Sequence, residues 1–183
     1  MRDILLQGFL RSPLTEPRPA ADDSELAALS AQLKRGVDKT FGRSLAIRHV
    51  DAGSCNACEL EIHALNNPFY DLERFGLKFV ASPRHADVLL VTGPVTRNMR
   101  EALERTYAAT PAPKWVVASG ACAIDGGFYR ESYACVGAAA DVIPVDLHIP
   151  GCPPEPIMLV KGLLALLCPE PANLSILTVP HPS

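Results

Sequence analysis

The clearest strand signal in the chain is DVLLVTGP at residues 87–94, in which the four residues VLLV form a continuously apolar run. A run of this kind, ended by Gly93-Pro94, is typical of a strand that is buried on both faces of a sheet. A second run, KWVVAS at residues 114–119, has the same character, and residues 96–108 between them have the pattern of a helix. This order of strand, helix and strand predicts a parallel sheet with helices on both faces.

The same alternation continues outward from this unit in both directions. We expect further helices at residues 22–39, 56–65 and 155–167, and further strands at residues 45–50, 78–81 and 142–145. The sequence therefore predicts an α/β fold with a doubly wound, mainly parallel sheet. In such sheets ligands bind beyond the carboxyl ends of the strands, so the loops to examine follow Val50, Val91, Ala118 and Val145.

The composition indicates one folded domain with an extended segment at each end. The chain has 183 residues, of which 48% are hydrophobic and 20% charged, a balance that excludes a disordered or fibrous protein. The net charge of −3 provides no basic surface for nucleic acid. Prolines cluster near both ends, so we expect an N-terminal arm at residues 1–21, a domain at residues 22–168 and a C-terminal tail at residues 169–183.

The apolar segments are too short to predict a membrane span. The longest of them, residues 157–168, includes Lys161 and falls short of the roughly 20 residues that a span needs. The N-terminal sequence has neither a long apolar region nor a cleavage site of small residues, so no signal peptide is expected. An unexported chain keeps its thiols reduced, and clustered cysteines then bind metal more often than they form disulfides.

Three of the four expected carboxyl-edge loops carry cysteine. Cys55 and Cys58 form a C-x-x-C motif after the first strand, and Cys122 and Cys152 follow two later strands singly. Structural zinc favours two C-x-x-C pairs, whereas one pair with two single cysteines, and proline after the last, is typical of a [4Fe–4S] cluster. The spacing favours an iron–sulfur cluster over a zinc site and over a site without metal. Both of these alternatives stay open. The remaining cysteines, Cys135 and Cys168, are predicted to be packing residues.

Four segments in order resemble a known family. They are GSCNACELEI (53–62), SPRHADVLLVTGPVT (82–96), SGACAIDGG (119–127) and PVDLHIPGCPPEP (144–156). Across residues 45–167 the chain resembles the small iron–sulfur subunit of group 4 membrane-bound [NiFe] hydrogenases of the formate hydrogenlyase and hydrogenase-4 type. The superfamily also includes the 20 kDa, B-type subunit of complex I, the NADH:quinone oxidoreductase. The resemblance implies a flavodoxin-like domain that holds one [4Fe–4S] cluster on Cys55, Cys58, Cys122 and Cys152.

The spacing of the first two cysteines separates the branches of this superfamily. Complex I subunits typically have adjacent cysteines, in a C-C-x-x-E motif. Here the residue before Cys58 is Ala57 and the motif is C-x-x-C-x-x-E, which is the hydrogenase arrangement. A complex I-type subunit that passes electrons to quinone remains the alternative. A non-catalytic scaffold with a zinc-bound or degenerate site is a further one.

The resemblance implies an oxidoreductase subunit whose catalytic metal lies in another chain. The cluster would relay electrons to or from the NiFe site of a partner large subunit, in proton reduction or H2 oxidation. The other implied partners are a ferredoxin-like iron–sulfur subunit and membrane subunits, with this chain peripheral on the cytoplasmic side of the inner membrane. The electron donor stays open among formate, CO, ferredoxin and NADH.

Two charged residues in the matching segments are additional candidates. Glu61 lies one helical turn after Cys58 and could relay protons near the metal sites; the alternative is an exposed or salt-bridged helix residue. Arg84 could place a positive charge near the cluster and raise its potential; the alternative is a surface arginine in a turn.

Overall fold

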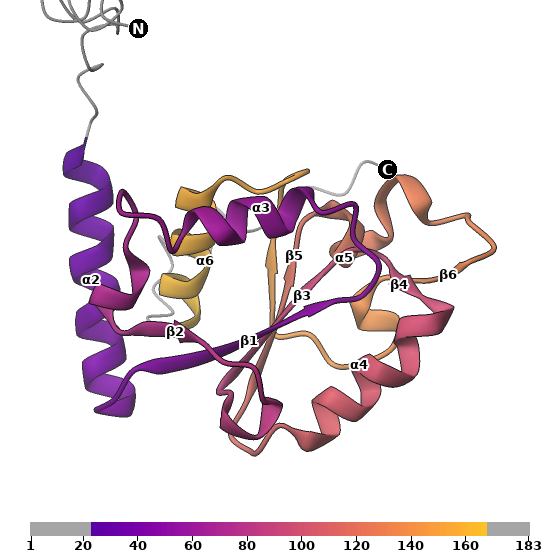
Figure 1. Cartoon of the computed structure of the whole chain (residues 1–183), viewed down its shortest axis with the longest axis horizontal. Coiled ribbons are helices and arrows are strands. Elements are labelled where there is room, and N and C mark those ends of the chain that lie inside the picture. The colour runs from indigo at the N-terminus through magenta and orange to yellow at the C-terminus, as the bar shows by residue number, and fades with distance from the viewer. Residues whose placement is uncertain (1–22, 168–183) are drawn as a thin grey trace, which may run out of the picture.

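The computed structural model describes residues 23–167, which form a five-stranded parallel sheet with helices on both faces (Figure 1). The strand order is β2-β1-β3-β5-β7. The strands are β1 (Leu45–Asp51), β2 (Leu77–Phe79), β3 (Val88–Thr92), β5 (Trp115–Ser119) and β7 (Leu147–Ile149). Counted along the chain within this sheet, the order is 2-1-3-4-5, that of flavodoxin-like folds. The predicted doubly wound α/β fold is therefore confirmed.

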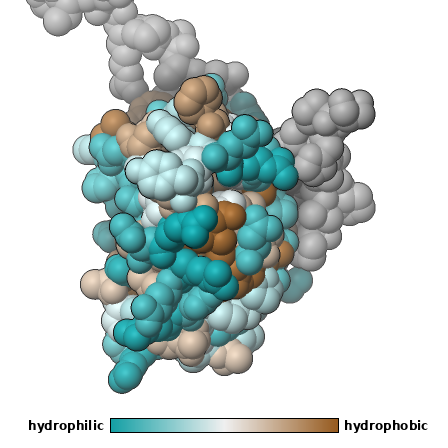
Figure 2. Space-filling model, turned by 90° about the vertical axis from the view of Figure 1, so that its right-hand side faces the viewer, coloured by the Kyte–Doolittle hydropathy of each residue, from teal (hydrophilic) through white to brown (hydrophobic). Residues whose placement is uncertain are grey.

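Different helices cover the two faces of the sheet. One face packs against α2 (Asp23–Phe41), α3 (Ala57–Ala64) and α6 (Pro156–Leu167). The other packs against α4 (Arg97–Ala109) and α5 (Ala121–Asp125). Figure 2 views the molecule from the right-hand side of Figure 1, where most of the visible surface is hydrophilic. Short 3-10 helices lie between these elements within residues 23–167. They are η1 (Leu72–Phe75), η2 (Pro83–His85), η3 (Gly127–Tyr129) and η4 (Ala139–Asp141).

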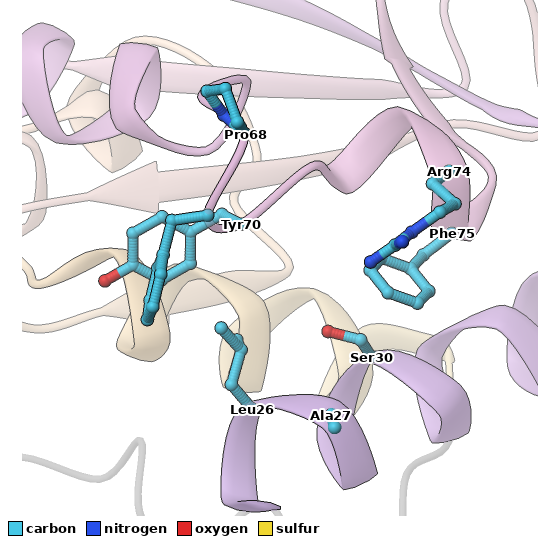
Figure 3. Close-up of a pocket in the computed structure, with 8 residues that line it drawn as sticks. Leu26, Ala27, Ser30, Pro68, Tyr70, Arg74 and Phe75 are labelled. Atoms are coloured by element: carbon cyan, nitrogen blue, oxygen red, sulfur yellow. The ribbon is translucent and has the colours of Figure 1, made fainter. Parts of the chain in front are cut away.

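A cavity of about 480 Å³ lies beside α2, between that helix and the segment that follows α3. Leu26 and Ser30 line it from α2, and Tyr70, Arg74 and Phe75 line it from the opposite side (Figure 3). Because α3 runs away from the first cysteines toward α2, this cavity is at the far end of α3 from the C-x-x-C motif (Figure 1).

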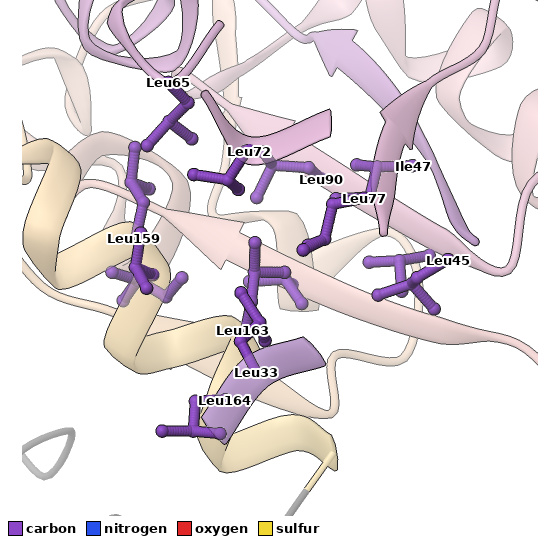
Figure 4. Close-up of a cluster of buried hydrophobic side chains, with 14 of the residues drawn as sticks. Leu33, Leu45, Ile47, Leu65, Leu72, Leu77, Leu90, Leu159, Leu163 and Leu164 are labelled. Atoms are coloured by element: carbon purple, nitrogen blue, oxygen red, sulfur yellow. The ribbon is translucent and has the colours of Figure 1, made fainter. Parts of the chain in front are cut away.

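The main core lies between the sheet and the helices α2, α3 and α6. Leu45, Ile47 and Leu90 contribute to it from the strands and meet Leu33 of α2 and Leu163 of α6 (Figure 4). All five side chains are almost completely buried, and each such burial stabilises the fold by roughly 1.5–3 kcal/mol. The apolar character of α6, visible in the sequence on nearly all sides, is explained by its position in this core.

The predicted strand at residues 142–145 is wrong. These residues follow η4, and the fifth strand of the sheet is Leu147–Ile149. Ile143 is buried in the core beneath α4 and α5, with Val142 and Val145 packed against that core, so the apolar run reflects packing instead of strand pairing. A small antiparallel pair, β4 (Val95–Thr96) with β6 (Cys135–Gly137), was not anticipated.

Some predictions lie outside the described residues. They are the N-terminal arm at residues 1–21, the tail at residues 169–183 and the packing role of Cys168. Within residues 23–167 no helix combines the length and the apolarity that a bilayer span requires.

Candidate metal centre

The four predicted ligands all lie in loops or helix starts at the carboxyl edge of the sheet. Cys55 follows β1 and Cys58 is in the first turn of α3. Cys122 is in α5, directly after β5, and Cys152 follows β7. Cys58 is buried and Cys122 half-buried, whereas Cys55 and Cys152 are exposed. The fold thus brings together three segments that are distant in the sequence.

Backbone hydrogen bonds fasten these loops to one another. The Gly120 N–H donates to the Ile149 carbonyl at 2.9 Å, and the Ala121 N–H donates to the Gly151 carbonyl at 2.8 Å. These bonds join the segment of Cys122 to that of Cys152. On the other side, the Thr96 N–H donates to the Ala52 carbonyl at 2.8 Å, which joins the loop after β1 to the loop after β3.

Two glycines let the backbone pass close to the sulfur atoms. A Cβ on Gly120 would lie 2.7 Å from Cys58 Sγ, and one on Gly127 would lie 2.8 Å from Cys122 Sγ. Any larger residue would collide with a thiol at these positions. The backbone N–H of Phe128 also donates to the Cys122 sulfur. Hydrogen bonds of this kind tune the potential of a metal–thiolate centre.

The loop of Cys55 is shaped by its own polar groups. Asp51 Oδ1 accepts the N–H groups of Gly53 and Ser54 at 2.8 and 2.7 Å. Asn56, between the two cysteines, has φ of 75°, a left-handed conformation that asparagine tolerates better than most residues. This turn separates exposed Cys55 from buried Cys58.

The electrostatics of the thiols fit a cationic metal centre. Burial, followed by the charges of Glu59 and of the other three cysteines, raises the pKa of Cys58 to about 12. Burial, then Cys152 and Cys55, raises the pKa of Cys122. The charges of Cys55 and Cys152 thus oppose the ionisation of Cys58 and Cys122, and a bound iron cluster would relieve that repulsion. Within residues 23–167 no three His, Cys, Asp or Glu side chains are grouped closely enough for a single metal ion.

Ser119 provides a further polar group at this edge. It precedes Gly120, is completely buried, and its Oγ has no hydrogen-bond partner among the described residues. A buried hydroxyl without a partner costs about 1–3 kcal/mol and requires an explanation. A sulfur atom beside Gly120 would accept the hydrogen bond of this hydroxyl, and sulfur is the atom that the four cysteines provide.

A buried carboxylate beside the cysteines was not predicted from the sequence. Glu59 is 7% exposed and accepts hydrogen bonds from Ser54 Oγ at 2.6 Å and from Thr92 Oγ1. Its Oε1 also lies 3.5 Å from His49 Nε2. Helical periodicity could have found it, because Glu59 precedes the buried Ile62 by three residues and therefore lies on the inner face of α3.

The two charged candidates from the sequence are placed differently. Glu61 is half-buried on α3, and its charge contributes, after burial, to a raised pKa of Tyr70. Arg84 is exposed in η2, just before the amino end of β3, and η2 contacts α4. The structure does not bring Arg84 together with the cysteines. Cys135 is half-buried in β6, outside the group of four.

The fold is a flavodoxin-like domain with four cysteines at the carboxyl edge of its sheet, the edge where ligands bind in sheets of this kind. Residues 55–166 match the family described as NADH ubiquinone oxidoreductase, 20 Kd subunit. The chain belongs to this family, as the sequence motifs had indicated.

Two relatives are each similar to more than two thirds of this chain. Formate hydrogenlyase subunit 7 of Escherichia coli is 43% identical over 82% of this chain and 58% of its own length. The probable membrane-bound hydrogenase subunit mbhJ of Pyrococcus furiosus is 49% identical over 70% of this chain and 77% of its own. The chain therefore spans little more than half the length of the first of these relatives.

A solved structure has the same fold. It is a chain of the membrane-bound sulfane sulfur reductase, described as an archaeal respiratory membrane complex. The TM-score is 0.61 at 35% identity, and the match covers 75% of this chain and 73% of that one. A chain similar to this one is therefore part of a complex that is named a sulfane sulfur reductase and not a hydrogenase.

Proposed function

We propose that this chain holds one [4Fe–4S] cluster on Cys55, Cys58, Cys122 and Cys152 and works as an electron-transfer subunit. It relays single electrons to or from the NiFe site of a partner large subunit in a membrane-bound hydrogenase complex. The observation that carries the proposal is the convergence of three cysteine-bearing loops at one edge of the sheet, fastened by the bonds of Gly120 and Ala121. The cluster supplies the electron carrier, and the chain supplies ligands, burial and hydrogen bonds.

Exposed apolar side chains in the segments that follow Cys58 and Cys122 favour a covering partner. Leu60 of α3 is 62% exposed, and Phe128 and Tyr133, which follow Cys122, are 94% and 91% exposed. Exposed aromatic residues are enriched where protein surfaces meet. We assign this surface to the large subunit, whose contact would exclude water from the cluster. A ferredoxin-like iron–sulfur subunit and membrane subunits are the other proposed partners, with the chain peripheral on the cytoplasmic side of the membrane.

The cysteine motif and the relatives favour hydrogenase over quinone reduction. The C-x-x-C-x-x-E arrangement around Cys58 is that of the hydrogenase branch, and the relatives from E. coli and P. furiosus have hydrogenase names. The family description, which names a ubiquinone oxidoreductase, supports quinone reduction as the second candidate. Identifying the co-purifying large subunit tests this choice: two nickel-binding C-x-x-C motifs support hydrogenase, and their absence supports the quinone reductase.

The ligand assignment is tested by replacing one cysteine. Cys122→Ser should abolish or strongly reduce the low-temperature EPR signal of the dithionite-reduced complex, because the cluster loses one of four thiolates. Cys135→Ala is the matched control and should retain the signal, since Cys135 lies in β6 outside the group. An unchanged signal in Cys122→Ser, or stoichiometric zinc with no visible absorption band, would refute the proposal.

Glu61 is proposed as a proton relay at the same edge. It lies on α3 one turn beyond Cys58, and it is half-buried. Glu61→Gln should then slow proton-coupled turnover of the complex while the EPR signal of the cluster stays intact. Equal activity of Glu61→Gln and wild type would reduce Glu61 to a structural helix residue.

A further inference from the structure

Glu59 differs from the other acidic residues of the described chain in its environment. It is almost completely buried, yet the one basic side chain that it meets within residues 23–167 is His49, at 3.5 Å. Burial lowers the pKa of His49, against the opposing charges of Glu59 and Asp51, so the imidazole tends to be neutral. Hydroxyl groups, and not a guanidinium or ammonium group, therefore provide most of the stabilisation of this carboxylate.

The direction of each hydrogen bond follows from the available protons. The Thr92 hydroxyl has one hydrogen, which it donates to Glu59 Oε1. Its contact with His49 Nε2 at 2.9 Å must then be a bond that the ring N–H donates. Ser54 donates to the other carboxylate oxygen at 2.6 Å. Every bond is donated into Glu59, as suits an acceptor-only, negatively charged carboxylate.

These bonds connect the first metal-binding segment to the sheet. Ser54 precedes Cys55, Glu59 follows Cys58, and Thr92 is the last residue of β3. Ser54 Oγ also accepts the Asn56 N–H at 3.2 Å, so the same hydroxyl contacts the residue between the cysteines. Glu59 consequently holds both ends of the C-x-x-C segment against the end of a buried strand.

We propose that Glu59 is the positioning residue of this metal centre and that its negative charge lowers the reduction potential of the cluster. This inference rests on the proposed function. Reduction adds one electron to the cluster, and a fixed negative charge beside Cys58 opposes that addition. Glu59 is the next residue after Cys58 and is 7% exposed, so its charge lies close to this ligand and is little screened by solvent. Neither Glu61 nor Arg84 has a comparable connection to a ligand.

The test uses the purified complex with Glu59→Gln, Glu59→Ala and a matched control, Glu101→Gln. Glu101 is an exposed acid on α4, paired with Arg105, so its variant loses the same charge outside the bonds described here. Redox titration followed by EPR measures the midpoint potential of the cluster. Amide hydrogen exchange of residues 53–56, measured also on the chain without its cluster, reports how firmly the segment is held.

We expect the midpoint potential to shift to more positive values in Glu59→Gln and Glu59→Ala and to stay unchanged in Glu101→Gln. Exchange of residues 53–56 should be roughly tenfold faster in Glu59→Ala and near wild type in Glu59→Gln, whose amide retains hydrogen bonds. An unchanged potential in both variants overturns the electrostatic role, and unchanged exchange in Glu59→Ala overturns the positioning role. If the wild-type complex contains no cluster, the proposed function and the electrostatic role of Glu59 are both refuted. Amide hydrogen exchange of the cluster-free chain then still decides the positioning role of Glu59.

Discussion

Two buried carboxylates lie at opposite ends of strand β3, and their partners are different in kind. Asp87, directly before the strand, and Glu59, bound to its last residue, are both 7% exposed. Asp87 accepts two bonds from the guanidinium of Arg43, at 2.8 and 2.6 Å, and one from the Ala46 N–H at 2.9 Å. Glu59 accepts from two hydroxyls and lies near an imidazole.

The difference separates a structural acid from one that can act on a neighbouring group. The charge of Asp87 is neutralised by Arg43, so it contributes little field beyond its own surroundings, and its bond to Ala46 fixes the start of β1 beside β3. The charge of Glu59 is solvated by dipoles without being cancelled, and it lies beside Cys58, a proposed ligand. The amino edge of the sheet thus serves folding, and the carboxyl edge carries the proposed metal centre.

The largest effect is expected at the structural end. Asp87→Ala leaves the Ala46 N–H without its acceptor and Arg43 without its partner, and should lower the free energy of unfolding by about 2–4 kcal/mol. Urea unfolding followed by the fluorescence of Trp115, the single tryptophan of the chain, measures this. Asp87→Asn keeps one oxygen that can accept the Ala46 N–H and should cost clearly less. Equal losses in the two variants would mean that the ionic charge, and not the hydrogen-bond geometry, holds this end.

A smaller, pH-dependent effect is expected at the other end. Burial lowers the pKa of His49 in the folded chain, so below the unfolded value of about 6.5 the unfolded state binds more protons. Stability should therefore fall as the pH drops below about 6.5, until the folded pKa is passed. Urea unfolding at several pH values measures the trend, and His49→Gln should flatten it. A His49→Gln chain with the wild-type pH dependence would contradict this origin.

The smallest effect is expected for Arg84. Its side chain is exposed before the amino end of β3, where solvent screens its charge from the cysteine loops. Arg84→Gln should leave the midpoint potential of the cluster unchanged within error, in contrast to Glu59→Gln. A negative shift as large as the positive shift of Glu59→Gln would restore Arg84 as a tuning residue and weaken the contrast between the two edges.

Much of the architecture could be predicted because it depends on local patterns. The apolar runs at β3 and β5 are visible in the sequence, and parallel strands place the following loops at one edge. The positions of Cys55, Cys58, Cys122 and Cys152 followed from that rule. The strand expected at residues 142–145 failed because Ile143 is apolar for core packing, a demand that a one-dimensional pattern does not distinguish from strand pairing.

The choice between similar residues depended on the tertiary structure. Glu59 and Glu61 are two positions apart on α3, and the sequence drew attention to the second because of its place in the motif. Only the packing of α3 over the sheet turns Glu59 inward to Thr92 and Ser54. Likewise, only the course of the chain between β2 and β3 places Arg84 away from the cysteines.

The sequence by itself determined the class of fold, the edge of the sheet where a site must lie and the four thiols that lie there. Each depends on short-range order, since strand periodicity and motif spacing are properties of contiguous residues. The tertiary structure decided which charges are buried, which are neutralised and which can act on a ligand. Those properties depend on groups from distant segments, such as Ser54, Glu59 and Thr92, whose contacts exist only in the folded chain.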